Sequence, residues 1–411
     1  MLLKGKSLLV LVLAVFLNMA FWSCTDSFHA EEGGKTDSLS VRTIVMYVVA
    51  ENSLAGNLEN DVRELLDYAP SMDKNQRIVL YVDDTDLPRI YCINSTTKAK
   101  SLEDSSFVAE KKYTSDKNSC DASVLKEVVS YAVRNHPASS YGLIFWSHAT
   151  GWVPYHESAG AKLRTSFGVD NQHNKRYNSG AGMNISDMAA ALEGFPKFDF
   201  IFFDACFMQC AESGYELRNT ADYIIGSPAE IPGIGAPYDK VMPLLFKADI
   251  NYQSVITQYN DYCVAYDGDG VPLSVIKCSQ LDAFAAHTVS YLKQYQAYIP
   301  FVDFSKVQNY FNYDKYGNSY PSYNKLPDFY DATSFMKELL PEIDYNIWKQ
   351  SLDKLVDCSV APSRYFSSYV NGTVAVDASS YSGVSMFVPQ SKFEGTNLLT
   401  DYYNSSFWTN N

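Results

Sequence analysis

The stretch FDFIFFDACFMQCAESGYEL, residues 198–217, decides the fold of this chain. Its first part is almost entirely apolar and aromatic, which is typical of a strand buried on both faces. Asp204, Ala205 and Cys206 follow, and the residues after them have a helical pattern that predicts a helix over 206–219. A cysteine therefore stands where a strand ends and a helix is expected to begin.

The same alternation of strands and helices runs through residues 41–300. The sequence predicts strands over 42–50, 77–84, 88–94, 141–148, 198–205, 221–228 and 272–278. It predicts further helices over 57–69, 121–137, 184–195, 236–246, 254–266 and 280–299. Asp121 is a suitable N-cap for one of these helices and Pro137 ends it. Apolar strands that alternate with helices predict an α/β/α sandwich with a mostly parallel central sheet.

The composition changes near residue 301. Residues 311–330 are rich in Tyr, Asn and Pro, and helical patterns return at 331–340 and 344–357. Three strand-like runs follow, RYFSSYV, TVAVDAS and GVSMFVP. Residues 301–411 are therefore expected to form a smaller C-terminal α+β subdomain next to a main domain over 41–300.

The N-terminus has the pattern of an export signal. Two lysines precede the 16-residue apolar run SLLVLVLAVFLNMAFW, and Ser23 and Cys24 end it. Residues 1–23 are predicted to be a lipoprotein signal peptide, with Cys24 as the lipidated mature N-terminus and 24–40 as a flexible tether. The chain is then expected in the bacterial cell envelope, anchored to a membrane. The alternative is an ordinary secretory signal with an incidental cysteine.

The composition limits the classes of partner. Of the 411 residues 46% are hydrophobic and 19% are charged, which is enough apolar material for a full core. The formal net charge is −14, and this argues against nucleic acid as a partner because nucleic-acid binding needs basic patches.

The cysteine and histidine spacing gives no metal pattern. Beyond Cys24 the chain has an odd number of cysteines, so at least one thiol is without a disulfide partner in the chain. No C-x-x-C is present, and no histidine close in sequence completes a site with a cysteine. No metal or cofactor is therefore predicted.

Two reactive side chains close predicted strands. His148 ends 141–148, and Cys206 follows the strand at 198–205. If a helix connects these strands they are parallel, so both side chains lie at one edge of the sheet, where ligands bind in open α/β folds. A helix N-terminus would lower the pKa of the thiol, and the imidazole could act as a base. His136 stands before Pro137 at a helix end, where positive charge is favourable.

These residues carry a family resemblance. LIFWSHATGW, together with FDACFMQCAESGYEL, whose first cysteine comes 58 residues after that histidine, resembles the clostripain family of cysteine peptidases. The family pattern D-x-C-x-M with a later Glu corresponds here to Asp204, Cys206, Met208 and Glu212. The resemblance covers roughly residues 41–390 and implies a caspase-like fold.

The resemblance also implies roles for single residues. Cys206 would be the nucleophile and His148 the base, and backbone N–H groups of Ala149 and Cys206 would form the oxyanion hole. Asp204 would lie beside the substrate pocket, and Glu230 would supply charge for a preference for Arg or Lys before the scissile bond. The family usually has Gly where this chain has Ala149, which could alter the oxyanion hole.

The interval 149–183 lacks a clear element pattern and is expected to be a loop. Family members are often activated by cleavage at a basic residue between His and Cys, and four candidates lie in this loop: Lys162, Arg164, Lys175 and Arg176. His156 and His173 also lie there. Some members need calcium, but the sequence has no recognisable calcium loop.

Two functions follow from these patterns. The first is a lipid-anchored cysteine endopeptidase that acts on peptide or protein substrates. The alternative is a surface lipoprotein that keeps the peptidase fold without activity and serves as a binding module. Three features favour the alternative: Ala149, the absence of an acid between Glu230 and Asp239, and the Tyr-rich C-terminal region.

Overall fold

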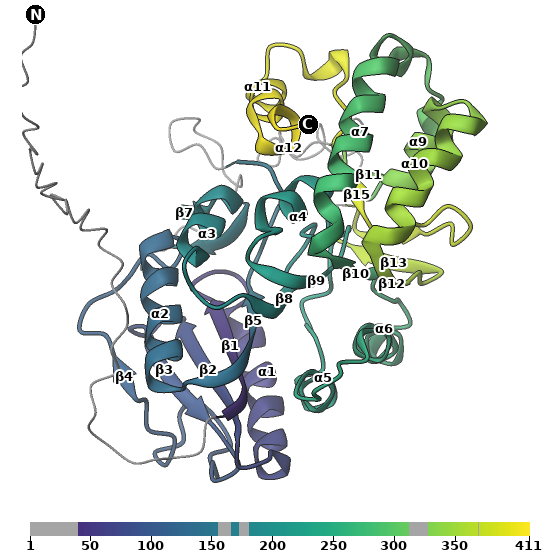
Figure 1. Cartoon of the computed structure of the whole chain (residues 1–411). Coiled ribbons are helices and arrows are strands. Elements are labelled where there is room, and N and C mark those ends of the chain that lie inside the picture. The colour runs from purple at the N-terminus through teal and green to yellow at the C-terminus, as the bar shows by residue number, and fades with distance from the viewer. Residues whose placement is uncertain (1–39, 155–165, 172–180, 312–327, 369) are drawn as a thin grey trace, which may run out of the picture. The chain divides into compact units, whose positions relative to one another are not determined.

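The computed structural model describes residues 40–154, 166–171, 181–311, 328–368 and 370–411, and it is shown in Figure 1. The described residues belong to one compact unit. No helix within the described ranges is both long enough and apolar enough to cross a lipid bilayer.

A nine-stranded sheet organises this unit, in the order β12-β10-β9-β8-β5-β1-β2-β3-β4. Its strands are β1 Ser40–Val49, β2 Gln76–Asp83, β3 Arg89–Ile93, β4 Lys111–Lys112, β5 Ala138–Trp146, β8 Phe198–Asp204, β9 Ala221–Gly226, β10 Leu273–Lys277 and β12 Val356–Val360. The five central strands, from β2 through β1, β5 and β8 to β9, are parallel, and the strands outside them are antiparallel. The predicted mostly parallel sheet is confirmed.

The helices are α1 Ala55–Tyr68, α2 Ala122–Asn135, α3 Ile185–Leu192, α4 Ala211–Leu217, α5 Tyr238–Leu245, α6 Tyr252–Asp267, α7 Leu281–Tyr295, α9 Ala332–Leu339, α10 Glu342–Leu355, α11 Asn397–Asn404 and α12 Ser406–Thr409. Short 3-10 turns lie at Ala69–Ser71, Cys278–Gln280, Gln296–Phe301, Phe304–Lys306 and Ser391–Phe393. The predicted cap of α2 is confirmed, because the Asp121 side chain accepts a hydrogen bond from Ser123 N.

Each face of the sheet has its own apolar core, because successive side chains of a strand point to opposite faces. In β8, Phe200 and Phe202 pack in the core on the side of α1, α5 and α6. Ile201 and Phe203 pack in the core on the side of α2, α3, α4 and α7. The apolar run that predicted a strand buried on both faces is thus divided between two helical layers (Figure 1).

Two expectations about the connecting segments need correction. The interval 149–183, expected to lack regular elements, contains the antiparallel strands β6 Phe167–Asp170 and β7 Ala181–Met183. The helix expected over 206–219 begins at Ala211 instead. The turn before it is held by backbone hydrogen bonds from Phe207 N to Ala229 O and from Gln209 N to Ser227 O.

Residues after 300 join the same fold. β12 pairs with β10 in the central sheet, and α10 packs against α7. The three strand-like runs appear as β13 Arg364–Ser367, β14 Gly372–Ala375 and β15 Ser385–Met386, the last paired with β11 Tyr330–Asp331.

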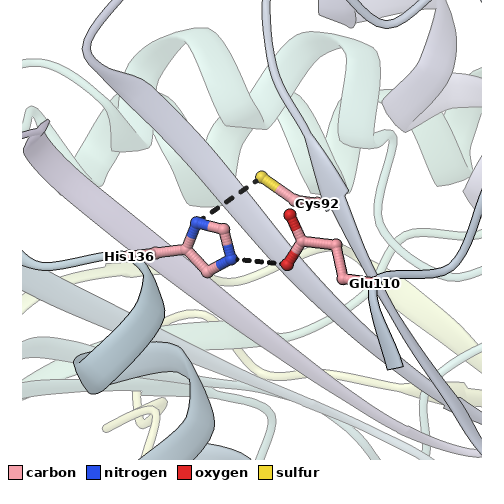
Figure 2. Close-up of side chains that lie close together, drawn as sticks. All are labelled: Cys92, Glu110 and His136. Carbon is pink, nitrogen blue, oxygen red and sulfur yellow. Dashed lines mark hydrogen bonds and ion pairs between the residues drawn. The ribbon is translucent and has the colours of Figure 1, made fainter. Parts of the chain in front are cut away.

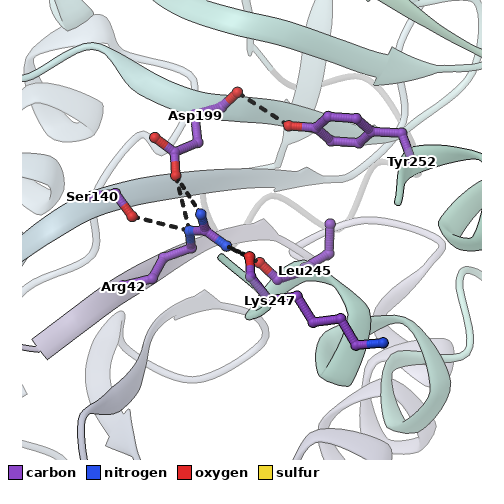
Figure 3. Close-up of polar contacts among 6 residues, drawn as sticks. All are labelled: Arg42, Ser140, Asp199, Leu245, Lys247 and Tyr252. Carbon is purple, nitrogen blue, oxygen red and sulfur yellow. Dashed lines mark hydrogen bonds and ion pairs between the residues drawn. The ribbon is translucent and has the colours of Figure 1, made fainter. Parts of the chain in front are cut away.

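The buried side chain of Arg42 connects the amino edge of the sheet with the end of α5 through hydrogen bonds (Figure 3). Arg42, only 5% exposed, donates to Ser140 Oγ (3.1 Å) and pairs with Asp199 (2.6 Å), and these residues lie at the starts of β1, β5 and β8. Its Nη1 donates to the backbone carbonyls of Leu245 (2.5 Å) and Lys247 (2.6 Å) at the end of α5. A guanidinium that satisfies carbonyls at a helix C-terminus also stabilises the helix dipole.

Candidate active site

The strands that lead to His148 and Cys206 are neighbours. β5 and β8 pair in parallel, and their register ends with Trp146 opposite Asp204. His148 and Cys206 each stand two residues beyond this last pair. Neighbouring strands are about 4.8 Å apart, so the two residues leave the sheet at equivalent places on its carboxyl edge. The expected adjacency of the two strands and their common direction are confirmed.

Cys206 lies in a turn and not at a helix N-terminus. Phe207 follows it with φ 61°, a left-handed conformation that is strained for a bulky side chain. The Cys206 Sγ accepts a hydrogen bond from Ile231 N at 3.4 Å. Strained backbone is often retained where it directs a functional group, and here it sets the direction of the chain immediately after the thiol.

The pKa of the Cys206 thiol differs from the expectation. A helix N-terminus was expected to lower it, but burial, with a smaller contribution from the negative charge of Glu230, raises the pKa of Cys206 well above that of a free thiol. The expectation was wrong because the helix begins five residues later, at Ala211. The resting thiol is therefore neutral.

His148 is held by a residue that the sequence gave no reason to select. The Ser53 hydroxyl lies 2.6 Å from His148 Nε2. Burial lowers the pKa of His148 to about 4, so the imidazole is neutral at physiological pH. Ser53 is 95 residues away in sequence, and no local motif marks it.

The backbone after His148 is fixed by the first part of the following interval. Ala149 forms an isolated β-bridge with Phe167 of β6, and it is 4% exposed. Gly168 N donates to His148 O at 2.8 Å, and Thr150 N donates to Ser166 O at 3.2 Å. The segment expected to contribute to an oxyanion hole is thus anchored on both sides of Ala149.

Asp204 is the last residue of β8 and is buried. Its carboxylate is satisfied by the hydroxyls of Tyr259 (2.6 Å) and Tyr238 (2.7 Å) and by Ala236 N (3.0 Å). Burial raises its pKa. Because Ala236 and Tyr238 belong to the segment that follows Ile231, Asp204 positions the chain that contacts the Cys206 thiol.

Glu230 lies closer to the surface. It is partly exposed, and its carboxylate accepts hydrogen bonds from the backbone N–H of Ser368 (2.9 Å) and from the Ser368 hydroxyl. Its charge contributes to the raised pKa of Cys206, so it lies within electrostatic range of the thiol.

Among the residues that the structure describes, two groups of side chains could bind a cation, although the sequence spacing indicated none. Glu51, Asp83 and Asp170 are buried near the carboxyl ends of β1, β2 and β6, and their ligand atoms lie within 4.8 Å of one another. Burial, with a further contribution from Asp170, raises the pKa of Asp83 to about 9. Cys92, Glu110 and His136 form the second group. Neither group was predictable, because its members are distant in sequence.

Several predicted residues lie outside the described ranges. These are Cys24 with the signal and tether, and the loop residues His156, Lys162, Arg164, His173, Lys175 and Arg176. The seven other cysteines lie within the described ranges, and all of them are free thiols.

The fold and the site together define a class: an α/β protein of caspase-like fold with a thiol and an imidazole at the carboxyl edge of its parallel sheet. The chain belongs to the clostripain family, whose model matches residues 46–411.

Its relatives agree with this assignment. Clostripain of Hathewaya histolytica is 27% identical over 221 residues, which are 48% of this chain and 41% of clostripain, so the alignment spans less than half of that protein. A secreted C11 cysteine protease from Bacteroides thetaiotaomicron, solved with an irreversible peptide inhibitor, is 30% identical with a TM-score of 0.72. That similarity covers 90% of this chain and 98% of the solved chain. An inactive zymogen C11 protease from Parabacteroides distasonis is 28% identical with a TM-score of 0.74 and covers 91% of this chain and 99% of its own.

Proposed function

We propose that this chain is a cysteine endopeptidase in which Cys206 is the nucleophile and His148 the base. The observation that carries the proposal is the register of β5 and β8, which end in parallel with His148 and Cys206 at equivalent positions. Membership of the clostripain family supports a peptidase over the binding module.

The reaction would begin with transfer of the Cys206 proton to His148 as Sγ attacks the carbonyl carbon of the scissile bond. Backbone N–H groups of Ala149 and Cys206 would stabilise the oxyanion of the tetrahedral intermediate. Collapse breaks the C–N bond, and the His148 proton passes to the leaving amine. Water, deprotonated by His148, then hydrolyses the thioester and releases the acid product and the free thiol.

The hydrogen bond to Ser53 supports this role of His148. If Nε2–H donates to the Ser53 hydroxyl, Nδ1 carries the lone pair and is free to accept the thiol proton. The resting pair is neutral, since burial raises the pKa of Cys206 and lowers that of His148. Charge separation would then develop only during attack on a bound substrate.

A preference for Arg or Lys before the scissile bond belongs to the proposal. Glu230 is partly exposed and within electrostatic range of Cys206, so its carboxylate could attract a cationic side chain of the substrate. Asp204 would act as a positioning residue for this part of the site, since its carboxylate accepts hydrogen bonds from Ala236 N and the Tyr238 hydroxyl.

Activation by cleavage between β5 and β8 is also proposed. The basic candidates are Lys162, Arg164, Lys175 and Arg176. The similarity to an inactive zymogen C11 protease supports a precursor state for this chain. We further propose that Cys24 carries a lipid that anchors the enzyme in the cell envelope, and the similarity to a secreted relative is consistent with export.

A peptide-library digest tests the proposed activity. The purified chain, under reducing conditions and with either calcium or EDTA, is expected to cleave peptides after Arg or Lys, and Cys206→Ala is expected not to. Cleavage after apolar residues only would contradict the specificity, and equal cleavage by Cys206→Ala would contradict the nucleophile. Mass spectrometry of the same sample checks lipidation and self-cleavage.

A further inference from the structure

A thiol, an imidazole and a carboxylate meet at the edge of the sheet opposite the candidate active site (Figure 2). Cys92 lies on β3, Glu110 directly precedes β4, and His136 is the C-cap residue of α2. The Cys92 Sγ is 3.8 Å from His136 Nδ1, and the Glu110 carboxylate is 2.7 Å from His136 Nε2.

The surrounding backbone holds these side chains in place. Glu110 N donates to Ile90 O at 2.8 Å, which fixes the segment before β4 against β3. His136 O accepts from the Thr43 hydroxyl at 3.0 Å near the start of β1. The group therefore lies at the amino edge of the parallel strands, whereas His148 and Cys206 follow their carboxyl ends.

The distances fit a tetrahedral zinc ion. With Zn–S of about 2.3 Å and Zn–N of about 2.0–2.1 Å, tetrahedral geometry separates sulfur and nitrogen by roughly 3.6 Å. The Cys92 Sγ and His136 Nδ1 are already 3.8 Å apart, and one ligand atom from each of the three residues lies within 4.8 Å of the others.

The second ring nitrogen has the partner that a zinc-binding histidine needs. A metal-binding imidazole usually donates its other N–H to a carboxylate, which fixes the tautomer. Here His136 Nε2 faces Glu110, and the Glu110 carboxylate also accepts from the Tyr131 hydroxyl at 3.1 Å. This leaves Nδ1, on the Cys92 side, as the nitrogen that can bind a metal.

The group is accessible to solvent. The side chains of His136 and Glu110 are 11% and 35% exposed, and Cys92 is partly exposed. Without a cation, His136 and Glu110 form an ion pair. Burial lowers the pKa of His136, but Cys92 and Glu110 raise it, with a net result of about 9, so zinc would have to displace a proton.

We propose that Cys92 Sγ and His136 Nδ1 bind Zn²⁺, with Glu110 as the carboxylate that orients the imidazole through its other ring nitrogen and with water completing the tetrahedral coordination. The cation would connect β3 with the residue that caps α2, and Glu110 would join the segment before β4 to this pair through His136 Nε2. The described cysteines form no disulfide, so a metal would supply the cross-link that exported proteins often obtain from one.

Cobalt binding tests the proposal with a direct readout. The experiment uses the full chain carrying Cys206→Ala, which removes the thiol of the candidate active site. Titration with Co²⁺ is expected to give one site per chain with a thiolate-to-cobalt charge-transfer band and tetrahedral d–d bands, and Zn²⁺ is expected to displace the cobalt. Calorimetry with Zn²⁺ alone measures the affinity.

Variants locate the site. In the same background, Cys92→Ser and His136→Gln are each expected to abolish the charge-transfer band, and Glu110→Gln is expected to weaken Zn²⁺ binding about 10–100-fold. Cys358→Ser, at another partly exposed thiol in the sheet, is the matched control and should bind normally. Absence of stoichiometric binding, or an unchanged band in Cys92→Ser, would overturn the proposal and leave only the ion pair.

Discussion

The two edges of the sheet use the same residue types in different states. At the carboxyl edge are Cys206, His148 and Glu230, and at the amino edge are Cys92, His136 and Glu110. Burial lowers the pKa of His148 to about 4. Burial also lowers the pKa of His136, but Cys92 and Glu110 outweigh it and raise the value to about 9.

The partner of the imidazole makes this difference. His148 Nε2 faces a serine hydroxyl, which carries no charge to stabilise an imidazolium. His136 Nε2 faces a carboxylate. A buried histidine without an acidic partner is neutral and can act as a base. A histidine that contacts a carboxylate is more easily protonated, or is oriented to bind a metal.

Removal of the carboxyl-edge thiol is expected to have the largest effect. Cys206→Ala should lower kcat by about 10⁴-fold or more, because no other group would form the acyl intermediate. Assays of peptide turnover measure this loss of kcat. Cys210→Ala, at a buried thiol four residues further on, is the matched control and should remain active. Loss of activity in both variants alike, with unchanged circular dichroism, would show that the effect does not depend on Cys206.

His148→Ala is expected to lower kcat by about 10²–10⁴-fold, the usual contribution of general acid–base catalysis. The amino-edge variant His136→Ala should leave kcat within about twofold, because it lies at the other end of the strands. Turnover assays measure both variants, and an equal loss of kcat in His136→Ala and His148→Ala would contradict the assignment of His148 as the base.

The pH profile distinguishes the two imidazoles. Because burial lowers the pKa of His148 to about 4, the acid limb of kcat/KM is expected near pH 4, since the base is inactivated only when it is protonated. Activity should therefore persist at pH 5. An acid limb near the ordinary histidine value of about 6.5 would show that burial does not control this base.

Ser53→Ala is expected to lower kcat about tenfold with little change in KM. The substitution removes one hydrogen bond, about 1–1.5 kcal/mol, and the His148 ring is then no longer held in one tautomer. A merely structural role would lower the melting temperature instead. The rate of Cys206 alkylation measures how well Ser53 positions His148. A lower rate in Ser53→Ala that Ser53→Thr restores supports this role, and an unchanged rate in Ser53→Ala argues against it.

Two acids of α1, the buried Asp61 and the exposed Asp67, give the prediction with the smallest expected effect on activity. Burial and Asp204 raise the pKa of Asp61 to about 9, against an unfolded value of about 3.9. The folded chain then binds more protons between these values, so the Asp61 contribution to the free energy of unfolding is full below pH 4 and falls as pH rises toward 9.

Asp61→Asn should make the free energy of unfolding fall less steeply with pH, by at most about 1.4 kcal/mol per pH unit. Asp67→Asn, an exposed carboxylate on the same helix, is the control and should not change the slope. Urea unfolding from pH 5 to pH 8 gives both slopes, and identical slopes for Asp61→Asn and the unaltered chain would contradict a protonated Asp61.

The sequence predicted the features that depend on local pattern. Apolar runs located β5 and β8, and alternation with helices predicted that they are parallel neighbours. Asp121 marked the start of α2. These features follow from residues that are close together in the chain.

The features that could not be predicted from the sequence depend on contacts between segments that are far apart in the chain. The turn after Cys206 is held by Ser227 and Ala229, so the helix begins later than its pattern suggests and the thiol lacks the expected dipole. Ser53 meets His148 across 95 residues. Cys92 lies on β3, Glu110 precedes β4 and His136 caps α2, and no spacing rule relates them.

The most direct measurement is covalent labelling of the full chain with a peptidyl acyloxymethyl ketone, followed by mass mapping of the modified cysteine. A single adduct on Cys206 is expected, with slower labelling in His148→Ala and none in Cys206→Ala, while Cys92 remains unlabelled. An adduct on another cysteine, or undiminished labelling of Cys206→Ala, would contradict it.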